Sequence, residues 1–204
     1  KLDHAGSQLH MIELSLLLSQ YQRKPAMIRD LTEQLQQICE TIGLPEYEGK
    51  LNCCRGIVMA NSDELPDGIA LIKQGLDQLK SVGTTEDVPL YTEYLAQALG
   101  RAQKADEALK YIDELLDSLE AQKLRYWQAE LFRRKGLLLQ DKGEMKQAKR
   151  YFLQALQTAN QQHALALALR ASISLHQFNH RCGLYPEARE TLEDIYGAFA
   201  EGQS

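Results

Sequence analysis

His176 and His180 are the side chains whose type and spacing come closest to a metal site. Four residues apart on a helix, the two imidazoles share one face, and Cys182 follows just beyond them. A zinc site needs a third and usually a fourth ligand, and the sequence supplies none at a recognisable spacing. We therefore predict a structural use, with His176 packing between helices and His180 lining a groove. The prediction is no metal site and no cofactor.

Motifs for catalysis or nucleotide binding are missing from the sequence. It contains no glycine-rich phosphate loop, no GxSxG turn and no HExxH pair. Cys39, Cys53, Cys54 and Cys182 show no spacing typical of a disulfide framework. The adjacent Cys53 and Cys54 are predicted to be small, half-buried apolar side chains in the reduced state. We predict that this segment has no catalytic residues, is not an enzyme, and is cytoplasmic.

Composition narrows the class of protein further. With 204 residues, of which 44% are hydrophobic and 25% charged, the chain can bury a core, which excludes disorder. The net charge is −5 and the basic residues are scattered, so direct nucleic-acid binding is not expected. No apolar run approaches the roughly 18 to 20 residues of a membrane span. The chain opens with Lys1-Leu2-Asp3, so we expect it to be an excerpt of a longer protein.

A period of forty residues organises most of the chain. Apolar residues recur at steps of forty in three registers, which begin at Ile72, Leu76 and Leu79. Spacings of four and three place these residues on one face of a helix. A second stripe precedes the first, with registers that begin at Leu51 and Met59. Each unit is therefore predicted to consist of two amphipathic helices.

Prolines near helix starts and glycines after helix ends complete the pattern. The predicted units cover about 7–43, 44–83, 84–123, 124–163 and 164–202. The predicted helices cover about 7–22, 26–42, 46–61, 66–82, 89–103, 105–121, 125–141, 145–161, 164–181 and 186–200. No unit can bury both of its stripes alone, so the units must stack. The predicted fold is all-α, a right-handed superhelical solenoid of about five antiparallel helix pairs in one domain, 1–204.

Small residues indicate which kind of helix pair this is. Two helices cross closely only where their side chains are small. Gly136 and Ala148 lie twelve residues apart in the third of the forty-residue copies, which is tetratricopeptide (TPR) spacing. Val58 and His176 stand where the first and fourth copies should have a small residue. The pattern is thus a degenerate TPR with a longer period.

The run 126–139 carries a more specific signature. Its residues Trp127-x-Ala-Glu-Leu-x-Arg-x-Lys-Gly136 resemble the C-terminal TPR-like (MalT-type) repeat region of large bacterial signalling ATPases, and the similarity extends over 125–202. Members of this family join a class III adenylate or guanylate cyclase, a kinase or a transcriptional regulator to an NTPase module. The resemblance implies a regulatory or scaffolding repeat domain. It leaves open which effector domain the parent protein carries.

A groove on the inner face of the solenoid is the predicted binding site. In TPR arrays this face comes mainly from the first helix of each pair. The side chains predicted to line it are Lys50, Glu93, Gln97, Arg101, Glu130, Arg133, Gln140, Arg170, Gln177, His180 and Arg181. Arg133 and Arg170 should lie close together on adjacent units. The set is either a polar groove for a peptide or a domain of the parent, or a solvated helix face, and both interpretations stay open.

Two alternatives to the regulatory domain remain. A free-standing peptide-binding adaptor would need a clamp of Lys and Asn, for which only Lys50 and Asn61 are available. The sensor domain of a maltose-activator-type transcription factor is a variant that the complete gene would distinguish.

Apolar residues near the C-terminus suggest a homodimer. Their stripe continues that of the earlier units, with nothing after it to cover an outward face. The predicted self-association residues are Leu192, Ile195, Tyr196 and Phe199. The expected partners are thus a protein or peptide segment, other domains of the parent chain, or a second copy, and neither nucleic acid nor membrane.

Overall fold

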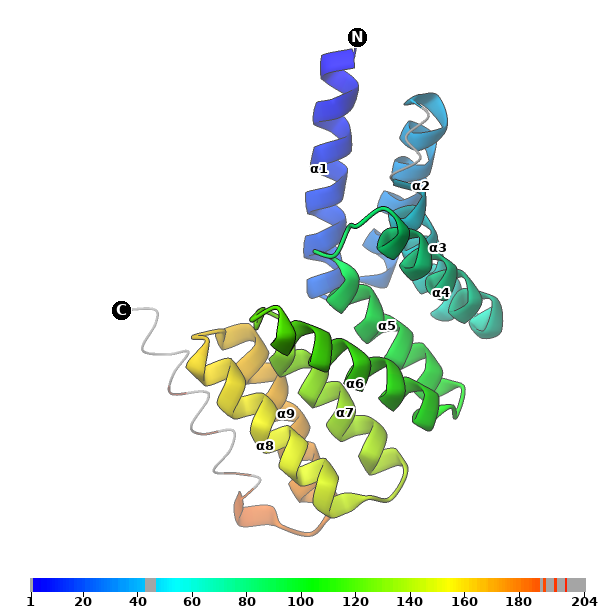
Figure 1. The fold of residues 1–204 in the computed structure, drawn as a ribbon. Coiled ribbons are helices and arrows are strands. Elements are labelled where there is room, and N and C mark those ends of the chain that lie inside the picture. The colour runs from blue at the N-terminus through cyan, green and yellow to red at the C-terminus, as the bar shows by residue number, and fades with distance from the viewer. Residues whose placement is uncertain (1, 43–46, 188, 190–192, 194–196, 198–204) are drawn as a thin grey trace. The chain divides into compact units, whose positions relative to one another are not determined.

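The computed structural model is built from helices only, within the residues that it describes (Figure 1). These residues are 2–42 and 47–187, together with 189, 193 and 197, with only the backbone described at 2–5 and 42. The chain forms two compact units, 1–102 and 103–204. None of the described helices combines the length and the hydropathy needed to cross a lipid bilayer. The predicted all-α fold of antiparallel helix pairs is confirmed.

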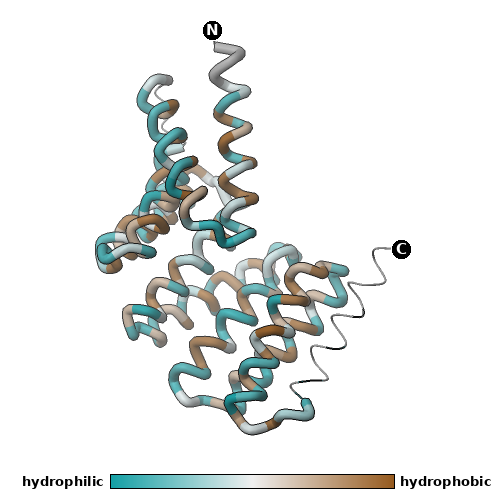
Figure 2. The backbone as a smooth tube through the Cα atoms, turned by 180° about the vertical axis from the view of Figure 1, so that it is seen from behind, coloured by the Kyte–Doolittle hydropathy of each residue, from teal (hydrophilic) through white to brown (hydrophobic). Residues whose placement is uncertain are grey.

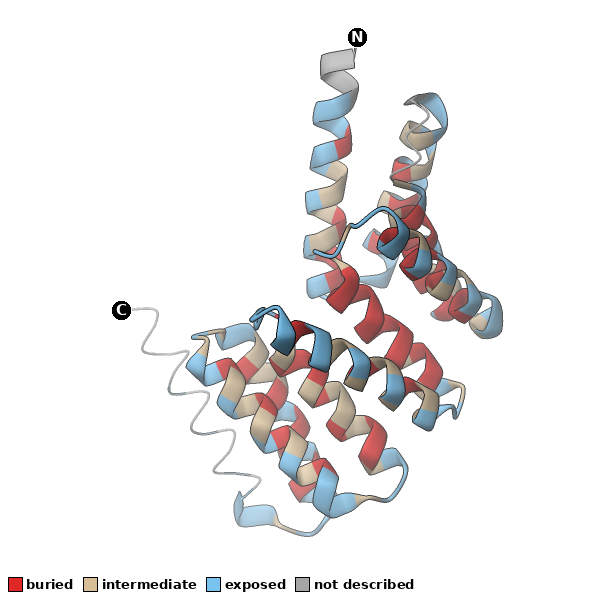
Figure 3. Ribbon diagram, viewed as in Figure 1, coloured by how far each residue is buried: buried red, intermediate tan, exposed pale blue. Residues whose placement is uncertain are grey.

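The unit 1–102 holds five of the helices. They are α1 (Leu2–Tyr21), α2 (Pro25–Ile42), α3 (Glu48–Ala60), α4 (Leu65–Ser81) and α5 (Val88–Arg101). Helices α1 and α2 pack together as one pair and α3 and α4 as the next, while α2 contacts α3 and α4 contacts α5. Helix α5 is buried along most of its length (Figure 3).

The unit 103–204 holds the other described helices. They are α6 (Ala105–Ala121), α7 (Gln128–Asp141), α8 (Met145–Gln161) and α9 (Leu165–Arg181). Helices α7 and α8 form a pair, α6 packs on α7, and α9 packs on both α8 and α7. Phe152 and Phe178 meet at the centre of this unit, with ring centroids 5.6 Å apart. Buried aromatic rings of α8 and α9 thus join successive helix pairs.

Small residues make the helix crossings, as predicted, in both units. A Cβ added to Gly136 on α7 would lie 2.7 Å from the Phe152 ring on α8. In the α3–α4 pair, a Cβ added to Gly56 would lie 2.7 Å from the carbonyl oxygen of Gly68. The prediction that Val58 stands at this position is wrong, because eighty residues before Gly136 the chain has Gly56. Val58 is only half-buried.

The helix ends follow the forty-residue period through backbone geometry. Gly83, Lys123 and His163, forty residues apart, all adopt a left-handed conformation, with φ of 75°, 56° and 52°. After α4 the N–H of Thr84 donates to the carbonyl oxygen of Leu79 at 3.0 Å, which closes the last turn in a Schellman motif. The second helices α4, α6 and α8 therefore stop at the same repeat position whether or not a glycine is present.

Two predicted helix starts differ from the structure. Helix α1 begins at Leu2 rather than near 7. Apolar and polar residues follow each other along its described part (Figure 2), and they do not form the single apolar face from which a helix start is predicted. Met11, Leu14 and Leu18 remain exposed on this helix. Helix α7 begins at Gln128 rather than 125, because the three preceding residues form the turn that leads into it.

Two further predictions rest on parts of the chain that the structure leaves undecided. The boundary between the compact units, after Ala102, falls within the predicted unit 84–123, so the single five-unit domain stays a prediction. The proposed self-association residues Leu192, Ile195, Tyr196 and Phe199 lie outside the described residues. The same holds for much of the predicted helix 186–200.

The crossing at Gly136 yields a stability prediction. Gly136→Leu should lower the free energy of unfolding by about 1 to 3 kcal/mol, because the new side chain must displace the Phe152 ring. Chemical denaturation followed by circular dichroism measures the change. Combined with Phe152→Ala, the loss should be smaller than the sum of the two single losses, since the leucine then occupies vacated volume.

Gly6→Ala is the matched control. A Cβ at this position on α1 meets nothing within 4 Å, so alanine should be neutral or stabilising by up to about 1 kcal/mol through helix propensity. An unchanged stability in Gly136→Leu would show that the α7–α8 crossing is not close.

Candidate functional site

One position of the repeat carries charge on three of the four first helices that follow α1. Lys50 on α3, Leu90 on α5, Glu130 on α7 and Arg170 on α9 are successive residues forty apart. In each compact unit the charged members of this set form ion pairs, which are described below one unit at a time. These pairs determine what the first helices can offer to a partner.

In the unit 103–204 the charges gather around Glu130. Arg133, one turn further along α7, binds its carboxylate through two bonds, Nε to Oε2 at 3.0 Å and Nη2 to Oε1 at 2.7 Å. Arg170 reaches the same carboxylate from α9, with Nη2 2.8 Å from Oε1. Arg133 also donates to Ser174 Oγ at 3.1 Å. The predicted proximity of Arg133 and Arg170 is confirmed, and two guanidinium groups share one carboxylate.

The exposure of this cluster differs from the prediction. Glu130 and Arg133 were expected to line an open groove, but Glu130 is 1% exposed and Arg133 8%. They are buried because successive first helices pack directly on each other, so that a charge at one repeat position faces the charge at the next. Arg170 remains accessible at the edge, with 23% of its side chain exposed. Together the three residues form a buried ion-pair cluster with one accessible guanidinium.

The unit 1–102 contains a similar buried carboxylate. Glu93 on α5 is fully buried rather than groove-lining, and it forms an ion pair with Arg23. Arg23 belongs to the turn after α1, and its guanidinium lies 4.3 Å from the ring centroid of Tyr94. Arg23 was not among the predicted groove residues, because it lies in the turn after α1 rather than on a first helix.

The remaining predicted groove residues are at least partly accessible. Gln97 and Gln140 are half-buried, whereas Arg101, Gln177, His180 and Arg181 are exposed. Arg101 donates a hydrogen bond to the carbonyl oxygen of Ala60. Gln177, His180 and Arg181 come from the C-terminal half of α9. This end of α9 therefore presents polar and basic side chains about two to three turns beyond Arg170.

The histidine pair on α9 has no partners for a metal among the described residues, where no group of three or more His, Cys, Asp or Glu is suitably placed. The rings of His176 and His180 lie 6.3 Å apart. His180 meets Tyr185 edge to face at 5.1 Å.

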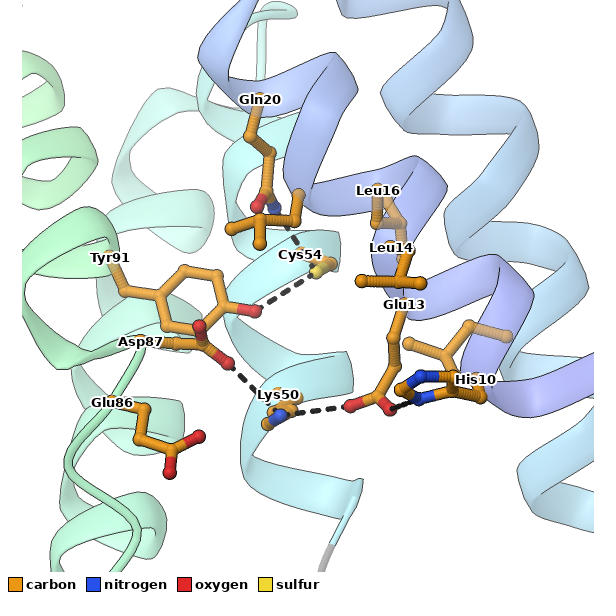
Figure 4. A pocket seen from close by; sticks show the side chains of 12 residues that line it. His10, Glu13, Leu14, Leu16, Gln20, Lys50, Cys54, Glu86, Asp87 and Tyr91 are labelled. Carbon is orange, nitrogen blue, oxygen red and sulfur yellow. Dashed lines mark hydrogen bonds and ion pairs between the residues drawn. The ribbon is translucent and has the colours of Figure 1, made fainter. Parts of the chain in front are cut away.

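A pocket of about 170 Å³ lies in the unit 1–102, between α1, α3 and the start of α5 (Figure 4). At its mouth Lys50 Nζ lies 2.8 Å from Glu13 Oε1 and 3.0 Å from Asp87 Oδ2. Partial burial disfavours the charge on Lys50, but the hydrogen bonds to Glu13 and Asp87 outweigh it and raise the pKa of Lys50 above its usual value. Lys50 is thus held as a cation between two carboxylates.

The floor of the pocket is a buried polar trio. Gln20 Nε2 donates to Cys54 Sγ at 3.4 Å, and Tyr91 Oη lies 3.7 Å from the same sulfur. Burial raises the pKa of the Cys54 thiol to about 11, although the contacts with Tyr91 and Gln20 lower it in part. The thiol is therefore protonated at neutral pH and is a poor nucleophile.

Two sequence predictions need revision at this pocket. Cys53 and Cys54 are fully buried rather than half-buried, because α3 packs between neighbouring helices on both of their faces. The pocket itself was not predicted. Its lining residues Glu13 and Gln20 come from α1, for which the forty-residue period offered no register, and Asp87 lies in the turn before α5.

Comparison with known proteins gives one related sequence at low identity. No protein-family model matches the chain. The uncharacterized protein R02095 of Rhizobium meliloti (strain 1021) is 26% identical over 178 residues. The match covers 87% of this chain but only 17% of R02095, so the chain spans about a sixth of that relative's length.

Solved structures with this fold are more numerous. A Rap protein complexed with the Competence and Sporulation Factor has a TM-score of 0.81 at 16% identity, covering 96% of this chain and 55% of that chain. For Bacillus thuringiensis PlcR, in complex with the peptide PapR7 and DNA, the TM-score is 0.77 at 11% identity, with coverages of 95% and 71%. A Podospora anserina kinesin light chain with TPR-like repeats has a TM-score of 0.64 at 15% identity, covering 98% of this chain and 96% of that chain. These likenesses show a TPR-like helical solenoid of paired helices.

The buried cluster predicts a large effect of Glu130→Gln. The substitution leaves two guanidinium groups beside a neutral amide, and should lower the free energy of unfolding by about 3 kcal/mol. Urea denaturation measures it, with the exposed Glu120→Gln on α6 as a control that removes the same charge. A loss no larger than in the control would mean that the Glu130 carboxylate is hydrated.

The raised pKa of Cys54 predicts a loss of stability at alkaline pH. Between its ordinary value of 9.0 and about 11 the thiol ionises only in the unfolded chain, so the free energy of unfolding falls as pH rises. Cys54→Val should remove about 2 to 3 kcal/mol of this fall. Cys53, Tyr91 and Lys50 remain in both proteins, so the difference between them reports the Cys54 thiol together with its coupling to Cys53 and Tyr91.

Urea denaturation at pH 8 to 11 under reducing conditions provides the measurement. Cys182→Val, which removes an exposed thiol, should keep the wild-type dependence. If Cys54→Val kept that dependence too, the Cys54 thiol would not be desolvated.

Proposed function

We propose that this chain is the protein-interaction repeat segment of a longer bacterial signalling protein and binds an acidic peptide or domain through its first helices. The observation that carries the proposal is the cluster of Glu130, Arg133 and Arg170. Two guanidinium groups around one carboxylate leave the cluster with a formal charge of +1, and Arg170 lies at its accessible edge. Such a group favours a carboxylate on a partner.

The polar end of α9 extends this basic surface. His180 and Arg181 are exposed about three turns beyond Arg170 on the same helix. An extended partner segment could contact several of these side chains at once, which is how helical repeat arrays bind without a deep pocket. The binding surface is therefore proposed to run along α9.

The longer parent protein is supported from two sides. The signature around Trp127 and Gly136 resembles the closing repeats of signalling ATPases. R02095, the related sequence, is also much longer than this chain. We place the segment next to an NTPase module linked to a nucleotidyl cyclase or a transcription regulator, where partner binding would restrain or release the catalytic modules.

A peptide sensor is the second candidate. The Rap and PlcR structures are complexes with a signalling factor and a peptide, and both have this helical fold. The chain would then act like the sensor domain of a MalT-like activator, or as a free-standing adaptor. A two-carboxylate clamp built on Lys50 fits less well, because Lys50 is already bound between Glu13 and Asp87.

Association with the rest of the parent tests the proposal. Residues 1–204 and the remaining polypeptide, expressed as separate chains, should form a complex measurable by calorimetry. Arg170→Gln should weaken it about three- to tenfold, and the complex should also weaken as salt rises. Lys146→Gln, which removes one exposed charge from the second helix α8, is the matched control.

The outcomes separate the two candidates. Equal effects of Arg170→Gln and Lys146→Gln would place the binding surface elsewhere than α9. Absence of any complex, together with saturable binding of a short acidic peptide, would favour the peptide sensor. Because Arg170 also pairs with Glu130, the free energy of unfolding of Arg170→Gln must be measured alongside, and binding compared where both proteins are folded.

A further inference from the structure

The pocket in the unit 1–102 has an excess of negative charge among its lining residues. Three carboxylates line it, those of Glu13, Glu86 and Asp87, against the single ammonium of Lys50. The lining thus carries a formal charge of −2 when His10 is neutral. A cleft whose lining has an excess of one sign attracts a ligand group of the other sign, and a cation is therefore the favoured occupant.

A hydrogen-bond acceptor on the pocket floor points to the same kind of ligand. Gln20 is 1% exposed and its side chain extends toward Cys54 (Figure 4). Its amide nitrogen donates to the Cys54 sulfur, whereas no donor to its carbonyl oxygen, Oε1, is found among the described residues. Because Gln20 lines the pocket, this oxygen is open to a ligand that donates hydrogen bonds.

The walls and the volume limit the size of the ligand. The apolar walls come from Leu14, Leu16, Leu17 and Leu35. The pocket volume of about 170 Å³ equals only a few waters at ~30 Å³ each. It is smaller than the roughly 300 to 1,000 Å³ of sites for drug-sized molecules. One long side chain with an apolar stem and a charged head matches these dimensions.

We propose that this pocket receives the guanidinium side chain of an arginine from a partner segment. Guanidinium carries five N–H donors in a planar fork, enough to serve Gln20 Oε1 and the carboxylates at the mouth together. Its three-carbon stem would lie along the leucines. The arginine would come from the partner segment of the proposed binding function, and in this respect the inference rests on that proposed function.

Titration of the full chain with Nα-acetyl-L-arginine amide tests the pocket without any partner protein. Two-dimensional NMR should show saturable shifts of the Gln20 side-chain amide and of the backbone amides of 50–54. Nα-acetyl-L-citrulline amide, which is isosteric and neutral, should bind at least tenfold more weakly. Higher salt should weaken only the arginine derivative.

Variants of pocket residues show whether the arginine derivative binds in the pocket. Glu86→Gln should raise the Kd of the arginine derivative about two- to fivefold, the range of an exposed ion pair. Gln20→Met, close in shape but without the amide, should raise it by a similar or larger factor. Glu48→Gln, at an exposed position on α3 outside the pocket, changes the net charge equally and should leave the Kd unchanged.

Three results would overturn the inference. They are equal affinity for the arginine and citrulline derivatives, shifts confined to residues away from the pocket, and equal effects of Glu86→Gln and Glu48→Gln. If Gln20→Met failed to fold, Glu86→Gln would still decide. Because the probe is a single amino-acid derivative, its failure leaves the association measured with Arg170→Gln standing, and the reverse also holds.

Discussion

The close approach of the two helices in each pair is the constraint on which the other features of this protein depend. Gly136 admits the Phe152 ring, and Gly56 and Gly68 bring two backbones together, where a single added carbon would clash. Helices that approach so closely bury a continuous apolar stripe between them. They also present the opposite face of each first helix to the next pair. The placement of charges on that face is therefore a consequence of the crossing.

Charge burial is the second consequence of this geometry. A carboxylate on a first helix is removed from water when neighbouring helices pack around it, and it persists only with a cationic partner. Glu130 has Arg133 and Arg170, and Glu93 has Arg23. In both compact units the polar side chains of the first helices thus hold helices together. Only those at the edges can also contact a partner.

The forty-residue period predicted most helices and the crossing at Gly136, because apolar and small residues report a packing that every copy repeats. It could not predict that α1 starts at Leu2, since that helix lacks a single apolar face. Nor could it distinguish a solvated carboxylate from a buried one. Glu93 is neutralised by Arg23, which lies seventy residues away in a turn. The pocket could not be predicted from the sequence, because Gln20 contacts Cys54 only through tertiary packing.

Glu130 and Arg170 occupy the same position in successive repeats but carry opposite charges. The two repeats are therefore not interchangeable, although their helices are alike. Consensus repeats can be duplicated because every interface is the same. Here a second copy of 124–163 would place one Glu130 against another Glu130 in a buried contact. Deleting 124–163 altogether would leave Arg170 without its carboxylate partner. The array therefore cannot gain or lose a copy of 124–163 unless a charge changes in the same step. Its length is therefore coupled to the order of its charges.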